Sequence, residues 1–144
     1  MDTSLAYTLH KLVFAMDREA DKVLKEKFDI SYQRAYFLFT LQQIGTVSQQ
    51  KIAAKLGYSA ASVSVMVTEL AKKGLVTIEP DPTHGRKRLV SLTPEGQMRV
   101  EAGNRLLSAK LSETIARAGI DESEYRKLTH TLYNTVIHSQ EGEK

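Results

Sequence analysis

The stretch that decides the fold is residues 48–92, SQQKIAAKLGYSAASVSVMVTELAKKGLVTIEPDPTHGRKRLVSL. Ser48 is placed to cap a short amphipathic helix, and Gly57 is placed to end it. Ser59 caps a second helix, after which Gly74 stands as the C-terminal glycine. Two helices joined by a glycine turn predict a helix-turn-helix, whose second helix can enter the DNA major groove.

The second helix has one apolar side formed by Val63, Val67 and Leu70, which we assign to the core. The other side carries Ala and Val, which can contact thymine methyl groups, and Ser, which can bond phosphates, but no Arg that could bond guanine. Specificity would then depend on DNA shape and on a neighbouring element. The candidate DNA-binding residues of the two helices are Gln49, Ser59, Ala60, Ala61, Ser62, Ser64, Val65 and Thr68.

A hairpin follows the second helix. Residues 75–78 and 89–92 are rich in Leu, Val, Ile and Thr, and the segment between them contains Pro80, Pro82 and Gly85. The pattern predicts two strands and a turn, a wing whose tip carries the three remaining candidate DNA-binding residues, Arg86, Lys87 and Arg88.

Positive charge is concentrated in the same segment. Residues 45–92 contain seven Lys or Arg and three acidic residues, whereas the rest of the chain contains thirteen basic and fourteen acidic residues. The formal net charge of +3 therefore comes from the helix-turn-helix and wing. Such a patch attracts the phosphate backbone of double-stranded DNA.

These motifs resemble those of the MarR family of bacterial winged-helix transcriptional regulators. The matching stretches are SQQKIAAKLGYSAASVSVMVTELAKKGLV and DPTHGRKRLVSLTPEG, and the resemblance extends over nearly the whole chain. It implies a homodimer on a palindromic operator, often released by a small ligand, and therefore most often a repressor. It also implies that Arg86 enters the minor groove, with Arg88 as the alternative, because His84 occupies the position where family wings usually carry an Asp.

The flanking regions predict long amphipathic helices. A first helix ends near Phe28, a largely apolar and buried helix covers residues 32–43, and two further helices cover residues 93–118 and 121–138. The fold class is mainly α with a small β-hairpin wing. We expect a single domain over residues 1–144, with a DNA-binding lobe at about 31–92 and dimerisation helices at about 4–28 and 93–138. The residues that define the apolar stripes are Leu5, Leu9, Leu12, Met16, Ala20 and Val23; Ala35, Tyr36, Leu38, Phe39 and Leu41; and Leu128, Leu132 and Val136.

Composition narrows the other possibilities. With 144 residues, 42% of them hydrophobic, the chain suits one compact domain. It has no apolar run or leader pattern that would direct it to a membrane. We therefore expect a cytoplasmic protein without a membrane partner. The absence of Cys excludes disulfides and thiol redox sensing. The four histidines are scattered and no phosphate-binding loop is present, so we expect no enzyme activity, no metal site and no cofactor. Two alternatives stay open: a winged-helix module that binds proteins rather than DNA, and a metal-responsive regulator of the same fold.

The family resemblance also implies an effector site where the dimerisation helices meet the DNA-binding lobe. By position it maps to Tyr7, His10, Lys11, Phe14 and Tyr36. Aromatic walls beside a cation or an imidazole suit a small aromatic or phenolic anion.

Overall fold

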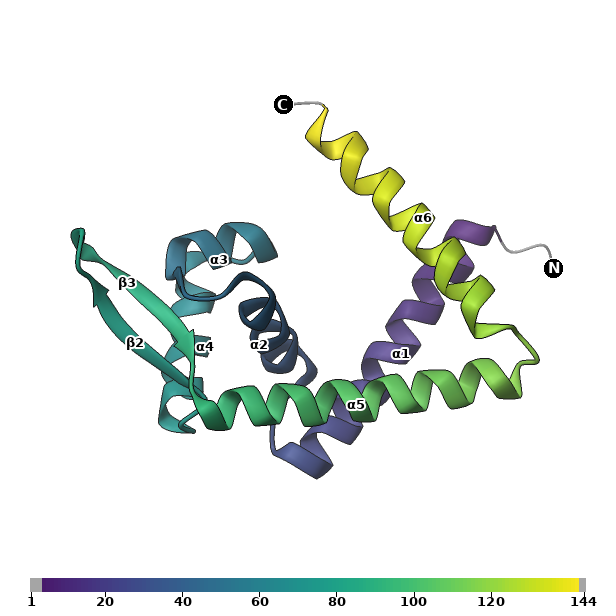
Figure 1. Ribbon diagram of the computed structural model, residues 1–144, viewed down its shortest axis with the longest axis horizontal. Coiled ribbons are helices and arrows are strands. Elements are labelled where there is room, and N and C mark those ends of the chain that lie inside the picture. The colour runs from purple at the N-terminus through teal and green to yellow at the C-terminus, as the bar shows by residue number, and fades with distance from the viewer. Residues whose placement is uncertain (1–3, 143–144) are drawn as a thin grey trace. The chain divides into compact units, whose positions relative to one another are not determined.

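The structure is a computed structural model that describes residues 4–142 (Figure 1). In chain order it contains α1 (Leu5–Phe28), α2 (Tyr32–Ile44), β1 (Val47–Ser48), α3 (Gln49–Leu56), α4 (Ala60–Lys72), β2 (Val76–Asp81), β3 (His84–Leu92), α5 (Pro94–Arg117) and α6 (Glu122–Glu141). The predicted fold class, mainly helical with a β wing, is confirmed. The chain forms two compact units that divide within α5, between Asn104 and Arg105.

Side-chain caps start the helices where the sequence predicts. The side-chain oxygens of Ser31, Ser48, Ser59 and Asp121 accept the backbone N–H of the residue three positions on, at 2.8–3.3 Å. Glycines end α3 and α4: Gly57 and Gly74 have φ values of 68° and 73°, which an L side chain rarely adopts. The helix-turn-helix is therefore fixed locally, by residues a few positions apart.

The sheet has three antiparallel strands in the order β1-β3-β2. The two predicted strands are present but longer than expected, and β1 was not expected at all. Val47 of β1 pairs with Val90 of β3, and it is buried. The apolar pattern marks only the part of the hairpin that touches the core, whereas backbone pairing continues beyond it through polar residues.

The core of the first unit lies between α2, α4 and the base of the wing. Phe37, Leu38 and Leu41 of α2 are fully buried. The prediction that Tyr36 is buried in this helix was wrong, because Tyr36 is 45% exposed and its neighbour Phe37 occupies the core instead. The reason is helical phase: Phe37, Leu38 and Leu41 share the inward side, and Tyr36 lies on the opposite side of the helix.

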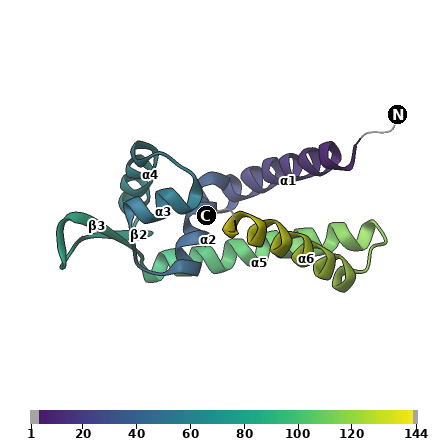
Figure 2. The same ribbon diagram turned by 90° about the horizontal axis from the view of Figure 1, so that it is seen from above.

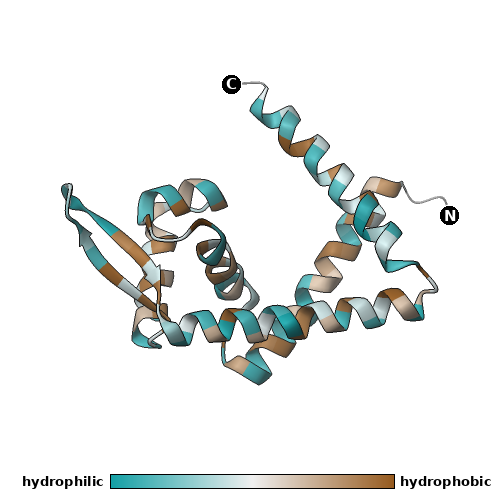
Figure 3. Cartoon of the chain, viewed as in Figure 1, coloured by the Kyte–Doolittle hydropathy of each residue, from teal (hydrophilic) through white to brown (hydrophobic). Residues whose placement is uncertain are grey.

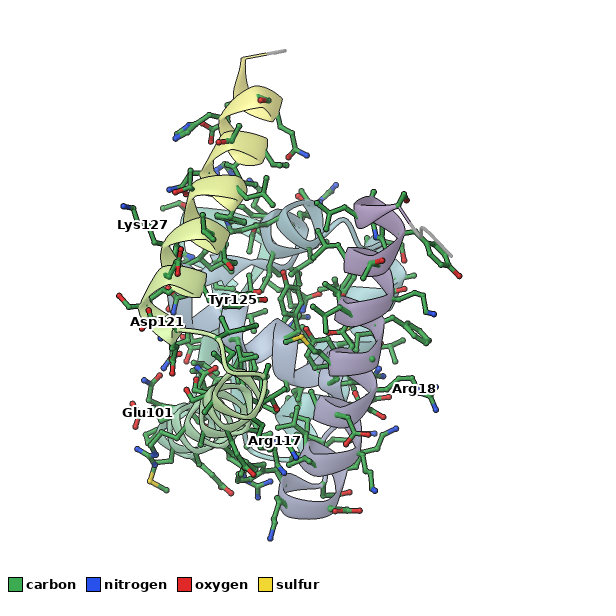
Figure 4. All side chains as sticks on the ribbon, turned by 90° about the vertical axis from the view of Figure 1, so that its right-hand side faces the viewer. Arg18, Glu101, Arg117, Asp121, Tyr125 and Lys127 are labelled. Carbon is green, nitrogen blue, oxygen red and sulfur yellow. The ribbon has the colours of Figure 1, made fainter. Side chains whose placement is uncertain are left out.

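The second unit contains the end of α5 and all of α6. Ser112 donates a hydrogen bond to Glu122, at 3.1 Å, across the turn that joins the two helices. Asp121 and Tyr125 lie at the start of α6 (Figure 4). Apolar and polar residues alternate along α6 (Figure 3), and none of its residues is buried in the single described chain. Among the described residues, no helix is long and apolar enough to cross a membrane.

Candidate nucleic-acid interface

The helix α4 has a buried side and an exposed side. Val63, Met66, Val67 and Leu70 face the core, so the predicted core side is confirmed. Its predicted DNA-binding residues are all exposed, namely Ser59, Ala60, Ala61, Ser62, Ser64, Val65 and Thr68. Gln49, the first residue of α3, is half-buried.

Hydroxyl groups on α4 form bonds within the helix. The Ser59 hydroxyl donates to Ser62 Oγ at 2.9 Å while accepting the Ser62 N–H at 3.1 Å. The Thr68 hydroxyl donates to the Ser64 carbonyl at 2.8 Å. The protons of these two hydroxyls are therefore already committed, which limits what the helix can offer to a base edge.

The β2–β3 hairpin extends away from the helices of its unit (Figures 1 and 2). Its turn consists of Pro82 and Thr83. The Asp81 carboxylate accepts the Thr83 N–H at 2.9 Å and the Thr83 hydroxyl at 2.7 Å. These two bonds hold the pKa of Asp81 below its ordinary value, with a smaller contribution from His84. Asp81 is therefore bonded to the turn itself.

The three basic residues of the wing are exposed, but their predicted place at the hairpin tip was wrong. Arg86, Lys87 and Arg88 lie on β3, beyond the turn. Asp81 pairs with His84, yet the preceding Pro80 pairs with Arg88, so Gly85, Arg86 and Lys87 bulge out of the ladder. Pro80 has no N–H to donate, which weakens regular pairing at this point of the edge strand. The bulge presents Arg86 and Lys87 on the outer half of the wing.

Two ion pairs connect α4 to the junction between α1 and α2, and no sequence pattern predicted them. The Arg34 guanidinium donates twice to the Glu69 carboxylate, at 2.8 and 3.0 Å. Lys73 bonds Asp29, with 3.2 Å to its carboxylate. Glu69 lies on α4 and Lys73 is its C-terminal cap, four positions further on, so both pairs constrain the orientation of that helix. Arg34 and Glu69 are 35 positions apart in the chain, and Asp29 and Lys73 are 44 positions apart. No local sequence pattern can predict contacts over such separations.

Comparison with known proteins identifies this arrangement. A family model described as the MarR family matches residues 28–87. The chain is 28% identical over 106 residues to the uncharacterized HTH-type transcriptional regulator YdgJ of Bacillus subtilis, a match that covers 71% of this chain and 65% of that protein. The chain thus spans less than two thirds of the length of that relative.

Solved structures agree in fold over nearly the full length. The apo form of wild-type MarR from E. coli has a TM-score of 0.81 at 21% identity, covering 94% of this chain and 98% of that chain. The S. aureus MepR–DNA complex has a TM-score of 0.74 at 25% identity, covering 95% and 99%. The chain thus matches the MarR family of winged-helix regulators in sequence over residues 28–87 and in fold over nearly its full length.

The effector residues that the MarR resemblance implies lie on two helices of the first unit. Tyr7, His10, Lys11 and Phe14 are exposed on α1, where Lys11 Nζ stands 5.6 Å from the Tyr7 ring. Arg18, labelled in Figure 4, stands 5.9 Å from the Phe14 ring. Tyr36 lies on α2, with its ring stacked 6.1 Å from that of Tyr32.

A shallow groove lies beside these residues, between α1 and the start of α2. It is lined by Asp17, Arg18, Tyr32 and Arg34 among others, and includes none of the five implied effector residues. Within the part of the chain that the structure describes, no group of three or more His, Cys, Asp or Glu side chains is arranged to hold a metal ion.

Proposed function

We propose that this chain acts as a MarR-family regulator and binds double-stranded DNA in a sequence-specific manner, with α4 in the major groove and the wing beside it. The observation that carries the proposal is that one unit of the chain exposes both the outer side of α4 and the basic residues Arg86, Lys87 and Arg88. A DNA complex of MepR, which shares this fold, supports the arrangement. Residues 31–92 serve as the DNA-binding lobe.

We infer that the active form is a homodimer on a palindromic operator, with residues 4–28 and 93–138 providing the contacts between subunits. Leu5, Leu9, Leu12 and Met16 are exposed along one side of α1, and Leu128, Leu132, Tyr133 and Val136 are exposed on α6. Most of the stability of a helix in a protein comes from packing of its apolar side, so these exposed apolar stripes need a partner surface. A two-fold dimer would cover both stripes, and its symmetry would place two recognition helices about one helical turn of DNA apart.

The role that these features suit best is a repressor released by a small aromatic or phenolic anion held near Tyr7, His10, Lys11, Phe14 and Tyr36. Exposed aromatic rings beside cations support this proposal. The anion would act only by binding the DNA-free form more tightly than the DNA-bound form, because equal affinity for both shifts nothing. Titration of salicylate into the protein–DNA complex, repeated with His10→Ala and Tyr36→Ala, tests this effector site. If both variants release DNA as the wild-type chain does, the anion does not bind at these residues.

The wing provides the test of DNA binding. If Arg86 enters the minor groove while Lys87 and Arg88 contact phosphates, Arg86→Ala weakens binding to the selected operator more than to random DNA. Lys87→Ala weakens both alike and flattens the dependence of log affinity on log salt by about one unit. Fluorescence anisotropy on both duplexes over a salt series measures these effects. A wing that tolerates all three alanine substitutions would instead favour a module that binds proteins.

A further inference from the structure

One line of side chains on α4 lies directly opposite its buried side. With 3.6 residues per turn, Ala61, Val65, Thr68 and Lys72 follow one another along the exposed surface. Val65, at the centre of this line, is 54% exposed. These side chains are the ones that would reach the floor of a groove, and Ala61 and Val65 can present only methyl groups there.

Thr68 adds a methyl group to the same line. Its hydroxyl proton is given to the Ser64 carbonyl, at 2.8 Å, which leaves the γ-methyl as the part of the side chain free to make an apolar contact. Ser62 and Ser64 stand on either side of the line and are exposed. Their hydroxyl protons are not used in a hydrogen bond to any described residue, so both can still donate.

Charged side chains are nearly absent from this surface. Between Ser59 and Lys72 the only charged residue is Glu69, and its carboxylate is held by Arg34 at 2.8 Å. Before Lys72 in its last turn, α4 therefore has no Arg, Lys, Asn or Gln side chain that could bond guanine or adenine in the major groove. What remains is a methyl surface with a serine on each side.

Thymine is the one ordinary DNA base that places a methyl group in the major groove, at C5. We propose that α4 reads thymine methyl groups through Ala61, Val65 and the γ-methyl of Thr68, while Ser62 and Ser64 donate to phosphates on the two sides of the groove. The operator half-sites are then rich in A·T pairs under α4. This inference rests on the proposed DNA binding and names the chemistry that the helix recognises.

Deoxyuridine provides the first test, because it pairs as thymine does and lacks only the methyl group. The operator is selected from a random duplex library with the full chain, and each thymine of the half-site is then replaced by deoxyuridine. Each contacted thymine should cost about fourfold in affinity, the equivalent of one methyl group removed from water. Equal affinity for the two duplexes overturns the inference, whereas failure to bind any duplex overturns the proposed DNA binding instead.

Two substitutions at Thr68 form a matched pair. Thr68→Val keeps a methyl group and removes the hydroxyl, so it should retain the preference for thymine over deoxyuridine. Thr68→Ser keeps the hydroxyl and removes the methyl group, so the preference should fall about fourfold at one position. Unchanged binding to random DNA shows that both variants are folded. A preference lost in Thr68→Val and kept in Thr68→Ser would mean that the hydroxyl, and not the methyl group, reads the base.

Discussion

Gly96 and Gly103 of α5 should respond in opposite ways to the same substitution. A Cβ on Gly96 would lie 2.0 Å from the Leu75 carbonyl oxygen, at the base of the wing. A Cβ on Gly103 would meet Leu24 at 3.5 Å and Phe39 at 3.6 Å, which is ordinary contact. Gly103 also lines a small apolar cavity that an added methyl group would partly fill.

The magnitudes follow from these contacts. A carbon and an oxygen atom normally stay about 3.3 Å apart, so α5 and the wing would have to separate by more than 1 Å, roughly the difference between that spacing and the 2.0 Å approach. Such overpacking costs about 1–3 kcal/mol. The movement would also strain the bond from the Thr93 N–H to the same carbonyl, now 3.1 Å. Adding about 1 kcal/mol for that bond and subtracting about 1 kcal/mol for the better helix propensity of Ala leaves a net loss of about 2 kcal/mol for Gly96→Ala.

Gly103→Ala retains the propensity gain without the clash, and should stabilise the protein by about 0.5–1 kcal/mol. The two variants should therefore differ by about 3 kcal/mol in the free energy of unfolding. Urea unfolding followed by circular dichroism measures this, at one protomer concentration, because dimer formation couples stability to concentration. A Gly96→Ala variant as stable as Gly103→Ala would refute the close packing of α5 on the base of the wing.

Three further results are expected. Ser64→Glu should abolish DNA binding in an electrophoretic mobility shift assay, because it places a carboxylate against phosphate, while the circular dichroism spectrum stays unchanged; binding that survives moves the interface away from α4. Leu132→Asp combined with Val136→Asp should give monomers or unfolded chains in analytical ultracentrifugation. A wild-type chain that is a stable monomer at micromolar concentration would contradict the proposed homodimer. Burial and the neighbouring Asp17 raise the pKa of Tyr32 to about 12. Its contribution to stability is therefore complete below the ordinary tyrosine pKa and is lost as the pH rises from there through the folded-state pKa of about 12. Ultraviolet titration should show the most alkaline step missing in Tyr32→Phe.

The sequence by itself determined the helices and their ends. The side chains of Ser48, Ser59 and Asp121 accept the backbone N–H of the residue three positions further on. Gly57 adopts a positive φ that other residues rarely adopt. Each of these helix boundaries therefore depends on neighbours in the chain. The buried side of α4 was equally readable, because Val63, Val67 and Leu70 repeat with the helical period. The same helical period indicated which predicted DNA-binding residues of α4 are exposed.

Only the tertiary structure decided how these elements meet. The pairing of Val47 with Val90 and the ion pair of Arg34 with Glu69 join segments that no short window contains together. The displacement of Arg86 from the tip into a bulge beside the Pro80–Arg88 pair depends on the strand register, which the apolar pattern of the hairpin does not show. Which hydroxyls of α4 are free also required coordinates, because a threonine can turn its proton toward solvent or toward its own helix. Contacts of this kind depend on the three-dimensional placement of the backbone, which the order of residues specifies only through the completed fold.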